Sequence, residues 1–167
     1  MSDGAGEGGA ASRRTSDPNS PVKSTILLVD DVPENLRVLA EVLVSAGHST
    51  RAVTSAKAAL KLLETVKVDL VLVDINMPEM SGFELCSVLK RMPSTRDVPV
   101  LFLSAATDTE HKVEAFRRGG VDYVSKPFQF EEIRARVETH LRLRRLQLEQ
   151  KALLERTLAG AIKTLKE

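Results

Sequence analysis

The sequence predicts an α/β fold in which five parallel strands form a doubly wound sheet, followed by a long C-terminal helical extension. Three observations support this prediction. From Thr25 onward, short apolar runs alternate with stretches whose apolar residues recur at helical spacing. Several runs are continuously apolar, as expected for strands buried on both faces. Strands that alternate with helices form parallel sheets with right-handed crossovers, and we expect the strand order 2-1-3-4-5.

The first half of the predicted sheet contains two strands and two helices. Pro33 suits the first turn of a helix, and Gly47 suits the position after its end. Thr54 or Ser55 is a suitable N-cap for the second helix. The expected elements are a strand at 26–29, a helix at 33–46, a strand at 49–53 and a helix that carries Ala56, Ala59, Leu60 and Leu63.

The second half continues the same alternation. Asp74 ends the third strand, and Pro78 and Gly82 then force a turn. Gly119 and Gly120 stop the fourth helix. The expected elements are a strand at 70–74, a helix at 82–91, a strand at 99–104, a helix at 108–118, a strand at 121–124 and a helix from 129 onward.

Three carboxylates follow two of the apolar runs. Asp30 and Asp31 come after the first strand, and Asp74 ends the third. These strands are neighbours in the expected order, so their carboxyl ends meet at the topological switch point. Carboxylates this close repel one another unless a cation lies among them, and Mg²⁺ prefers such a cluster. Taken alone, the Asp74 strand also allows a simpler interpretation, in which Asp74 only begins a turn.

The next two strands also end in polar residues. Ser104 closes the strand PVLFLS, and Lys126 follows the strand VDYVS. Four strands are thus followed by a carboxylate pair, a carboxylate, a hydroxyl and an ammonium group. This combination suits an anionic, metal-bound phosphoryl group.

In these motifs the chain resembles the receiver domain of two-component response regulators, which has a flavodoxin-like fold. The motifs that carry the resemblance are TILLVDD at 25–31, LVLVDINMPEMSG at 70–82, FLSA at 102–105, Tyr123, and the tripeptide Lys126-Pro127-Phe128. All five occur in the order and at the spacing of that family, and together they span the whole predicted sheet.

The resemblance implies a phosphoryl-transfer site. Asp74 would accept a phosphoryl group as an acyl phosphate, donated by a sensor histidine kinase or a phosphotransfer protein. Lys126 would supply positive charge to the transferring group. Mg²⁺ would be held by Asp31, Asp74 and the backbone carbonyl of Asn76, with Asp30 acting through water.

The resemblance also implies a switch. The hydroxyl of Ser104 would turn to bind the new phosphoryl oxygens, and Tyr123 would move into the vacated space. The surface formed by the fourth helix, the fifth strand and the fifth helix would then change. The simpler interpretations are that Ser104 begins a turn and that Tyr123 is an ordinary strand residue.

The organisation predicted for the chain is a disordered tail at 1–24, a receiver domain at 25–146 and a helical connector at 147–167. Glycine, proline and polar residues dominate the tail. Leucines at spacings of three and four continue beyond the receiver, so we expect a long fifth helix that pairs with a second copy as a coiled coil. An amphipathic tail folded back on its own receiver is the alternative.

The connector is similar to those that precede cyclic-dinucleotide phosphodiesterases of the HD type and nucleotide cyclases. We expect no output domain within the chain itself. Either the chain is a fragment that ends in a connector, or it is a small regulator whose helix is its output.

Composition excludes several classes of protein. The net charge of +1 over 167 residues gives no general bias toward nucleic acid or membranes. No apolar run has the ~18 residues of a membrane span or forms an apolar signal segment, and Cys86 has no second cysteine to pair with. We therefore expect a cytoplasmic protein.

Arginines at 134, 136, 142, 144 and 145 are interspersed with glutamates, which predicts a solvated helix face rather than a DNA-binding surface. His111 and His140 receive no function.

Three functions from different classes fit these residues. The first is a phosphorylation-controlled switch, which has no enzymatic activity beyond phosphorylation and dephosphorylation of itself. The second is a binding module that uses the receiver fold without phosphorylation. The third is a phosphatase with an aspartyl nucleophile, although such enzymes have a carboxylate two residues after the nucleophile and this chain has Asn76 there.

Overall fold

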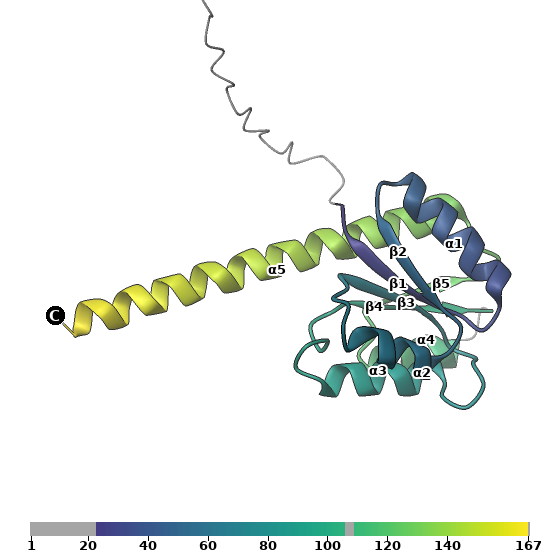
Figure 1. Ribbon diagram of the computed structural model, residues 1–167, viewed down its shortest axis with the longest axis horizontal. Coiled ribbons are helices and arrows are strands. Elements are labelled where there is room, and N and C mark those ends of the chain that lie inside the picture. The colour runs from purple at the N-terminus through teal and green to yellow at the C-terminus, as the bar shows by residue number, and fades with distance from the viewer. Residues whose placement is uncertain (1–22, 106–108, 167) are drawn as a thin grey trace, which may run out of the picture.

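Five parallel strands form the centre of the computed structural model, which describes residues 23–105 and 109–166 (Figure 1). Their order is β2-β1-β3-β4-β5, as the sequence predicts. The strands are β1 Thr25–Val29, β2 Ser49–Val53, β3 Leu70–Asp74, β4 Val100–Ser104 and β5 Asp122–Ser125. The doubly wound parallel sheet is therefore confirmed.

Helices cover both faces of this sheet (Figure 1). They are α1 Pro33–Ser45, α2 Ala56–Leu63, α3 Gly82–Arg91, α4 Thr109–Arg117 and α5 Phe130–Leu165. Buried residues of α1 and α5 share one apolar cluster, and those of α2, α3 and α4 belong to a second cluster on the other face. The sheet is thus the middle layer of three.

The alternation of side chains along each strand explains why the strands are continuously apolar. In β1, Leu27 and Val29 belong to the cluster with α2 and α3, whereas Ile26 and Leu28 belong to the cluster with α1 and α5. All four side chains are fully buried. A strand with helices on both faces has no side for solvent, so no polar residue alternates with the apolar ones.

Local signals begin the helices where they were expected. The side chain of Ser55 accepts a hydrogen bond from the backbone N–H of Ala58, so Ser55 rather than Thr54 is the N-cap of α2. Ser81 caps α3 in the same way through Glu84. Pro33 occupies the first turn of α1.

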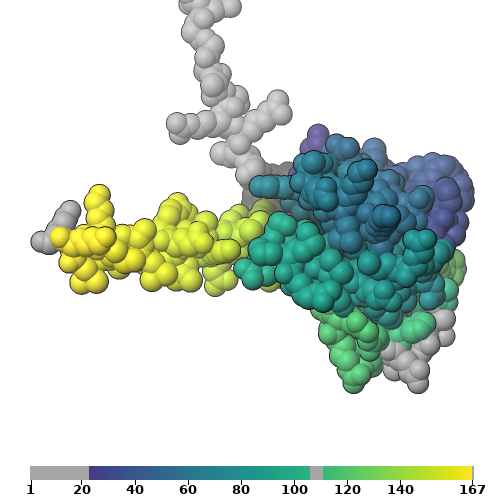
Figure 2. Space-filling model, turned by 60° about the horizontal axis from the view of Figure 1, so that its bottom comes forward, coloured from purple at the N-terminus to yellow at the C-terminus, as the bar shows by residue number. Residues whose placement is uncertain are grey.

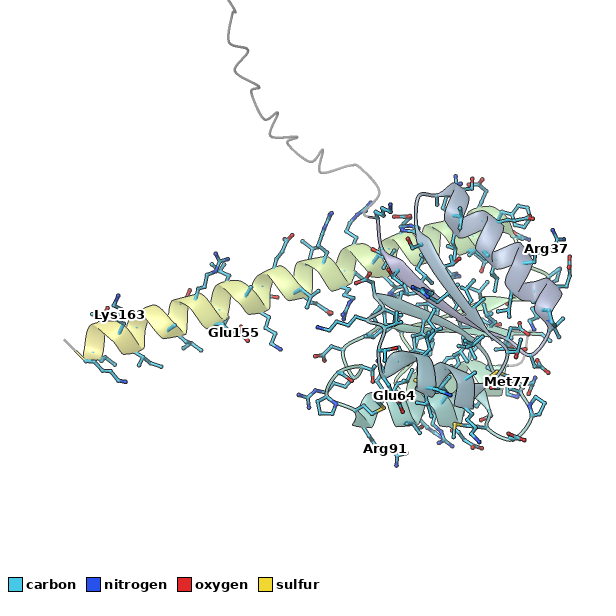
Figure 3. All side chains as sticks on the ribbon, viewed as in Figure 1. Arg37, Glu64, Met77, Arg91, Glu155 and Lys163 are labelled. Atoms are coloured by element: carbon cyan, nitrogen blue, oxygen red, sulfur yellow. The ribbon has the colours of Figure 1, made fainter. Side chains whose placement is uncertain are left out.

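The last helix is a single element of 36 residues. Its buried residues, Ile133, Val137 and Leu141, all lie in the first third, and the remainder projects away from the sheet (Figure 2). Side chains such as Glu155 and Lys163 point outward from this free part (Figure 3). Within the described chain, no helix combines the length and apolarity of a membrane span.

The described chain begins close to the predicted boundary of the tail. Residues 1–22 lie outside the described residues. Ser24, which we assigned to the tail, is 8% exposed, and its backbone N–H donates to His48 Nδ1 at 3.3 Å. Its carbonyl accepts from the N–H of Ser49 at 2.9 Å. The chain is therefore held against the sheet one residue before β1.

Candidate functional site

Three carboxylates converge at the carboxyl edge of the sheet. Asp30, Asp31 and Asp74 each place one carboxylate oxygen within 4.8 Å of the other two. The cause is the pairing of β1 with β3, in which Val29 lies opposite Val73, so the residues that follow them lie side by side. Asp30 and Asp74 are 0% and 4% exposed, whereas Asp31 is open to solvent. The predicted acidic cluster is present.

Hydrogen bonds fix the two buried carboxylates. Asp30 accepts from the backbone N–H of Val32 at 2.9 Å and from the side-chain amide of Asn35 at 3.1 Å. Asp74 accepts from the backbone N–H of Asn76 at 3.2 Å through one oxygen. Its other oxygen accepts from Lys126. Each carboxylate is thus held in a defined orientation.

Lys126 brings positive charge to this cluster from the far side of β4. Its Nζ lies 3.0 Å from Asp74 Oδ2 and 3.6 Å from Asp30 Oδ2. The backbone N–H of Lys126 donates to the carbonyl of Ser104 at 2.7 Å, which holds the end of β5 beside the end of β4. One ammonium group therefore faces two buried carboxylates.

The excess of negative over positive charge in this cluster affects the acidity of Asp74. Burial raises its pKa above the usual 3.8, and the nearby charge of Asp30 acts in the same direction. Hydrogen bonding and charge from Lys126 act against these effects without cancelling them. The donors are all oxygens, and they carry more negative charge than Lys126 neutralises. The cluster therefore fits a hard divalent cation such as Mg²⁺.

A glycine positions the turn that follows β3. Gly82 begins α3, and its N–H donates to the carbonyl of Ile75 at 2.9 Å. A Cβ at this position would overlap the carbonyl oxygen of Asp74. Only glycine allows the start of α3 to lie this close to the backbone of the acidic cluster.

Ser104 and Tyr123 lie where the sequence predicts them, on the neighbouring strands. Ser104 ends β4 at the same sheet edge and is 1% exposed. Tyr123 is 8% exposed, and its hydroxyl lies 2.9 Å from the hydroxyl of Ser125. The ammonium group of Lys112 on α4 lies 4.8 Å from the centre of the Tyr123 ring. Tyr123 thus has a polar contact on β5 and a cation–π contact with α4.

Three polar contacts that the sequence did not predict anchor α5. His48 Nε2 lies 2.5 Å from Glu138 Oε1, and the His48 side chain is fully buried. On the β5 side, Asp122 accepts from Arg136 at 2.8 Å, and its other oxygen lies 2.9 Å from His140 Nε2. Partners 14 to 90 residues apart leave no local signal in the sequence.

These contacts correct one interpretation made from the sequence and add a partner for His140. His140, which received no function, pairs with Asp122. The arginines of α5 do not form a uniformly solvated face, because Arg136 pairs with Asp122 and Arg144 donates to the backbone carbonyl of Asp97. The apolar face of α5 brings these side chains against the sheet edge.

Comparison with known proteins extends over most of the folded region. A family model described as the response regulator receiver domain matches residues 26–138. The chain is 41% identical over 121 residues to a Vibrio cholerae protein named probable cyclic di-GMP phosphodiesterase, which covers 72% of this chain and 27% of that protein. It is 39% identical over 119 residues to the heme response regulator HssR of Staphylococcus saprophyticus, covering 71% of this chain and 52% of HssR.

Solved structures agree with these matches. The chain is similar to the signal receiver domain of a histidine kinase from Syntrophus aciditrophicus, with a TM-score of 0.66, 31% identity and coverage of 71% and 89% of the two chains. The chemotaxis response regulator CheY4 of Vibrio cholerae gives a TM-score of 0.68 at 25% identity, covering 71% and 99%. This chain spans about half or less of the length of the two curated relatives named above. With its fold, its acidic cluster and the family match taken together, the chain belongs to the response regulator receiver family.

Proposed function

We propose that the protein is a phosphorylation-controlled switch in which Asp74 accepts a phosphoryl group from the phosphohistidine of a sensor kinase or phosphotransfer protein. One observation carries the proposal. Asp74 is a buried carboxylate that accepts a hydrogen bond from Lys126 and lies beside Asp30 and Asp31. A group that only began a turn would need none of these neighbours.

In the proposed reaction a carboxylate oxygen of Asp74 forms a bond to phosphorus while the P–N bond of the phosphohistidine breaks. The imidazole nitrogen keeps the electron pair and then takes a proton. Because phosphoryl transfer spreads charge over the equatorial oxygens, positioned cations favour it. Lys126 supplies a fixed positive charge 3.0 Å from the acceptor. Hydrogen bonds to both oxygens of Asp74 hold its carboxylate in place.

We infer that Mg²⁺ is the resident cation. Asp31, Asp74 and the backbone carbonyl of Asn76 would hold it, with Asp30 acting through water. When bound, Mg²⁺ would neutralise charge on the phosphoryl oxygens. The raised pKa of Asp74, caused by burial and by the charge of Asp30, is the expected state of an acidic site without its cation.

The direct test is mass spectrometry after treatment with acetyl phosphate and Mg²⁺. We expect the mass gain of one phosphoryl group, which Asp74→Asn abolishes and EDTA prevents. Lys126→Ala should slow the reaction strongly because the fixed charge is removed. No gain in the wild-type protein would favour the phosphorylation-independent binding module. Turnover of phosphate esters would favour the phosphatase.

We propose that Ser104 and Tyr123 pass the phosphorylated state to the surface. Ser104 is buried at the same sheet edge as Asp74, so its hydroxyl would be the one to bind a phosphoryl oxygen from this side. Tyr123 lies on the next strand and contacts Lys112 of α4. A change at Ser104 would therefore reach α4 and α5 through β5.

We further propose that the free part of α5 pairs with the same segment of a second copy. Six large apolar side chains in this part are more than half exposed: Leu146, Leu153, Leu154, Leu158, Ile162 and Leu165. A single helix that exposes them gains nothing from tertiary packing, on which most helical stability depends. Pairing would cover the leucines and stabilise the helix.

Sedimentation of the full chain with and without beryllofluoride tests this pairing. We expect a dimer in at least one of the two states, and the double variant Leu154→Ser, Leu158→Ser should be monomeric. Glu155→Ser, on the same turn, is the matched control and should leave the assembly unchanged. A wild-type monomer in both states would refute pairing and leave the receiver assignment intact.

The output of the switch is the last part of the proposal. In longer relatives such as the Vibrio cholerae protein, the matched region is only 27% of the length. We propose that α5 is the connector through which this receiver controls an output domain or a separate partner in the cytoplasm. A pull-down with the phosphorylated and unphosphorylated chain should recover that partner from one state only.

A further inference from the structure

A cleft lies where α5 leaves the sheet, at the strand edge opposite to Asp74. It is open and has a volume of about 500 Å³, and α5 forms one wall while the α3–β4 connection forms the other. Figure 2 shows the teal part of the sheet domain directly against the base of the projecting helix. The lining residues are Lys90, Arg96, Asp97, Pro99, Val121, His140, Leu143, Arg144, Gln147, Leu148 and Lys151.

The charge of this cleft differs from that of the whole chain. Two arginines and two lysines line it, and Asp97 is the one acidic residue among its lining. The complete chain is almost neutral, with a net charge of +1. Cations gathered in a concave site favour an anionic ligand.

Arg144 has a hydrogen-bond donor for which the described part of the chain provides no acceptor. Its Nη1 donates to the carbonyl of Asp97 at 2.9 Å. Its Nε is buried and has no hydrogen-bond partner within the described part of the chain. A guanidinium has five N–H donors, and the structure shows one of them donating to Asp97, so Arg144 keeps donors for an anion in the cleft.

Lys90 adds a donor on the opposite wall. Its Nζ donates to the carbonyls of Arg96 at 3.1 Å and Val98 at 2.7 Å, and an ammonium group has three donors. Burial lowers the pKa of Lys90, and a bound anion would favour its charged form. Lys90 and Arg144 thus approach the cleft from both sides.

Apolar side chains form the rest of the lining and limit the kind of anion. They are Pro99, Val121, Leu143 and Leu148. An inorganic phosphate would leave these side chains uncovered, whereas a flat organic ring would pack against them. The volume is within the range of roughly 300–1,000 Å³ that is usual for sites of small organic ligands.

We propose that the cleft between α5 and the α3–β4 connection binds a small organic phosphate of nucleotide size, with its phosphate on Arg144, Lys90 and Lys151 and its ring on the apolar wall. Such a ligand would link α5 to the sheet where α5 begins to project. The site is separate from Asp74 and does not depend on phosphorylation there.

Isothermal titration of the full chain with ADP in EDTA tests this proposal, because EDTA keeps metal-bound phosphate away from the acidic cluster. We expect one site, with binding weakened about tenfold or more in Arg144→Gln. Arg142→Gln is the matched control, since Arg142 lies on the same helix, is exposed and does not line the cleft. It should bind as the wild type does, as should Asp74→Asn.

Several outcomes would overturn the proposal. These are no binding of ADP at millimolar concentration, equal losses in Arg142→Gln and Arg144→Gln, loss of binding in Asp74→Asn, or equal affinity for ADP and pyrophosphate. Equal affinity would mean that the apolar wall has no part in recognition. Thermal unfolding of the two arginine variants, which should match the wild type, separates lost binding from lost folding.

Discussion

Gly82 lies directly against the backbone of Asp74: a Cβ on Gly82 would lie 2.9 Å from the carbonyl carbon of Asp74 and nearer still to its oxygen. The first residue of α3 therefore limits where Asp74 can lie. Four residues of the turn between β3 and α3, Asn76, Pro78, Glu79 and Ser81, are polar or exposed. The end of the turn, in contrast, is fixed by the backbone contact at Gly82.

The variant Gly82→Ala should disturb the site and the fold together. The methyl group must displace backbone rather than a flexible side chain, which should lower the free energy of unfolding by about 1–3 kcal/mol. Asp74 should shift with its carbonyl, so phosphorylation by acetyl phosphate should slow. Urea unfolding and phosphorylation rates measure the two effects, and a variant that matches the wild type in both would contradict this interpretation.

Gly160→Ala should act in the opposite direction. No atom lies within 4 Å of a Cβ at Gly160, and the residue is inside α5. Alanine should stabilise the helix locally by about 1 kcal/mol. Far-UV circular dichroism should show greater helicity, and hydrogen exchange should slow around residue 160. Unchanged exchange there would mean that α5 does not continue through this glycine in solution.

The metal-free protein should become more stable when Asp74 loses its charge. Because the folded state raises the pKa of Asp74 above 3.8, mainly through burial, the protonated form favours folding. The loss of stability that ionised Asp74 causes is absent below pH 3.8 and complete once the pH has risen through the folded-state pKa of Asp74. In EDTA at neutral pH, Asp74→Asn should therefore be more stable by on the order of 1 kcal/mol.

Chemical unfolding at several pH values tests this prediction. The difference between Asp74→Asn and the wild type should close as the pH falls toward 3.8. Added Mg²⁺ should stabilise the wild type more than the variant, because a ligand stabilises the state that binds it. A variant that is less stable than the wild type in EDTA at neutral pH would refute the prediction.

Asp122 should show the opposite dependence on pH. Burial alone would raise its pKa, but hydrogen bonds from His140, the Tyr123 N–H and Arg136 outweigh burial and lower it below 3.8. Its contribution to stability is therefore present above pH 3.8 and is lost as the pH falls through the folded-state pKa.

Replacement of Asp122 by asparagine should cost about 1–2 kcal/mol at neutral pH, a value reduced by the partial exposure of Arg136. The difference from the wild type should shrink below pH 3.8. Glu41→Gln on α1 is a suitable control, because its ion pair with Arg37 is exposed and should contribute little. A loss at Asp122 that does not depend on pH would indicate a packing defect instead.

Most of the fold follows from local signals in the sequence. Helix α3 begins and ends at the predicted residues, because Gly82 follows a serine cap and Met92 ends the apolar spacing. The last strand was placed one residue early: Val121 already donates to the carbonyl of Val100, but β5 starts at Asp122. Strand ends depend on pairing with the neighbour, which a single run of residues does not encode.

The acidic site was predictable for a different reason. Residues that directly follow parallel strands must gather at one edge, so Asp30 and Asp74 needed no knowledge of packing. The contacts of His48 with Glu138 and of Asp122 with His140 depend on how α5 crosses the sheet. That crossing is set by the apolar face of α5 and by the twist of the sheet. The spacing of residues in the sequence therefore predicts neither the partners in these contacts nor the distances between them.

From Leu141, the last buried residue of α5, the helix continues to Leu165, and Arg144 holds its base through the carbonyl of Asp97. At 1.5 Å per residue this is an arm of roughly 36 Å. A tilt of only about 5° at its base would sweep the far end sideways by roughly 3 Å, about half the pitch of a helix. Asp122 and His48 hold the base of α5. A sub-ångström movement of the sheet at this base is therefore amplified by the length of the helix at its far end.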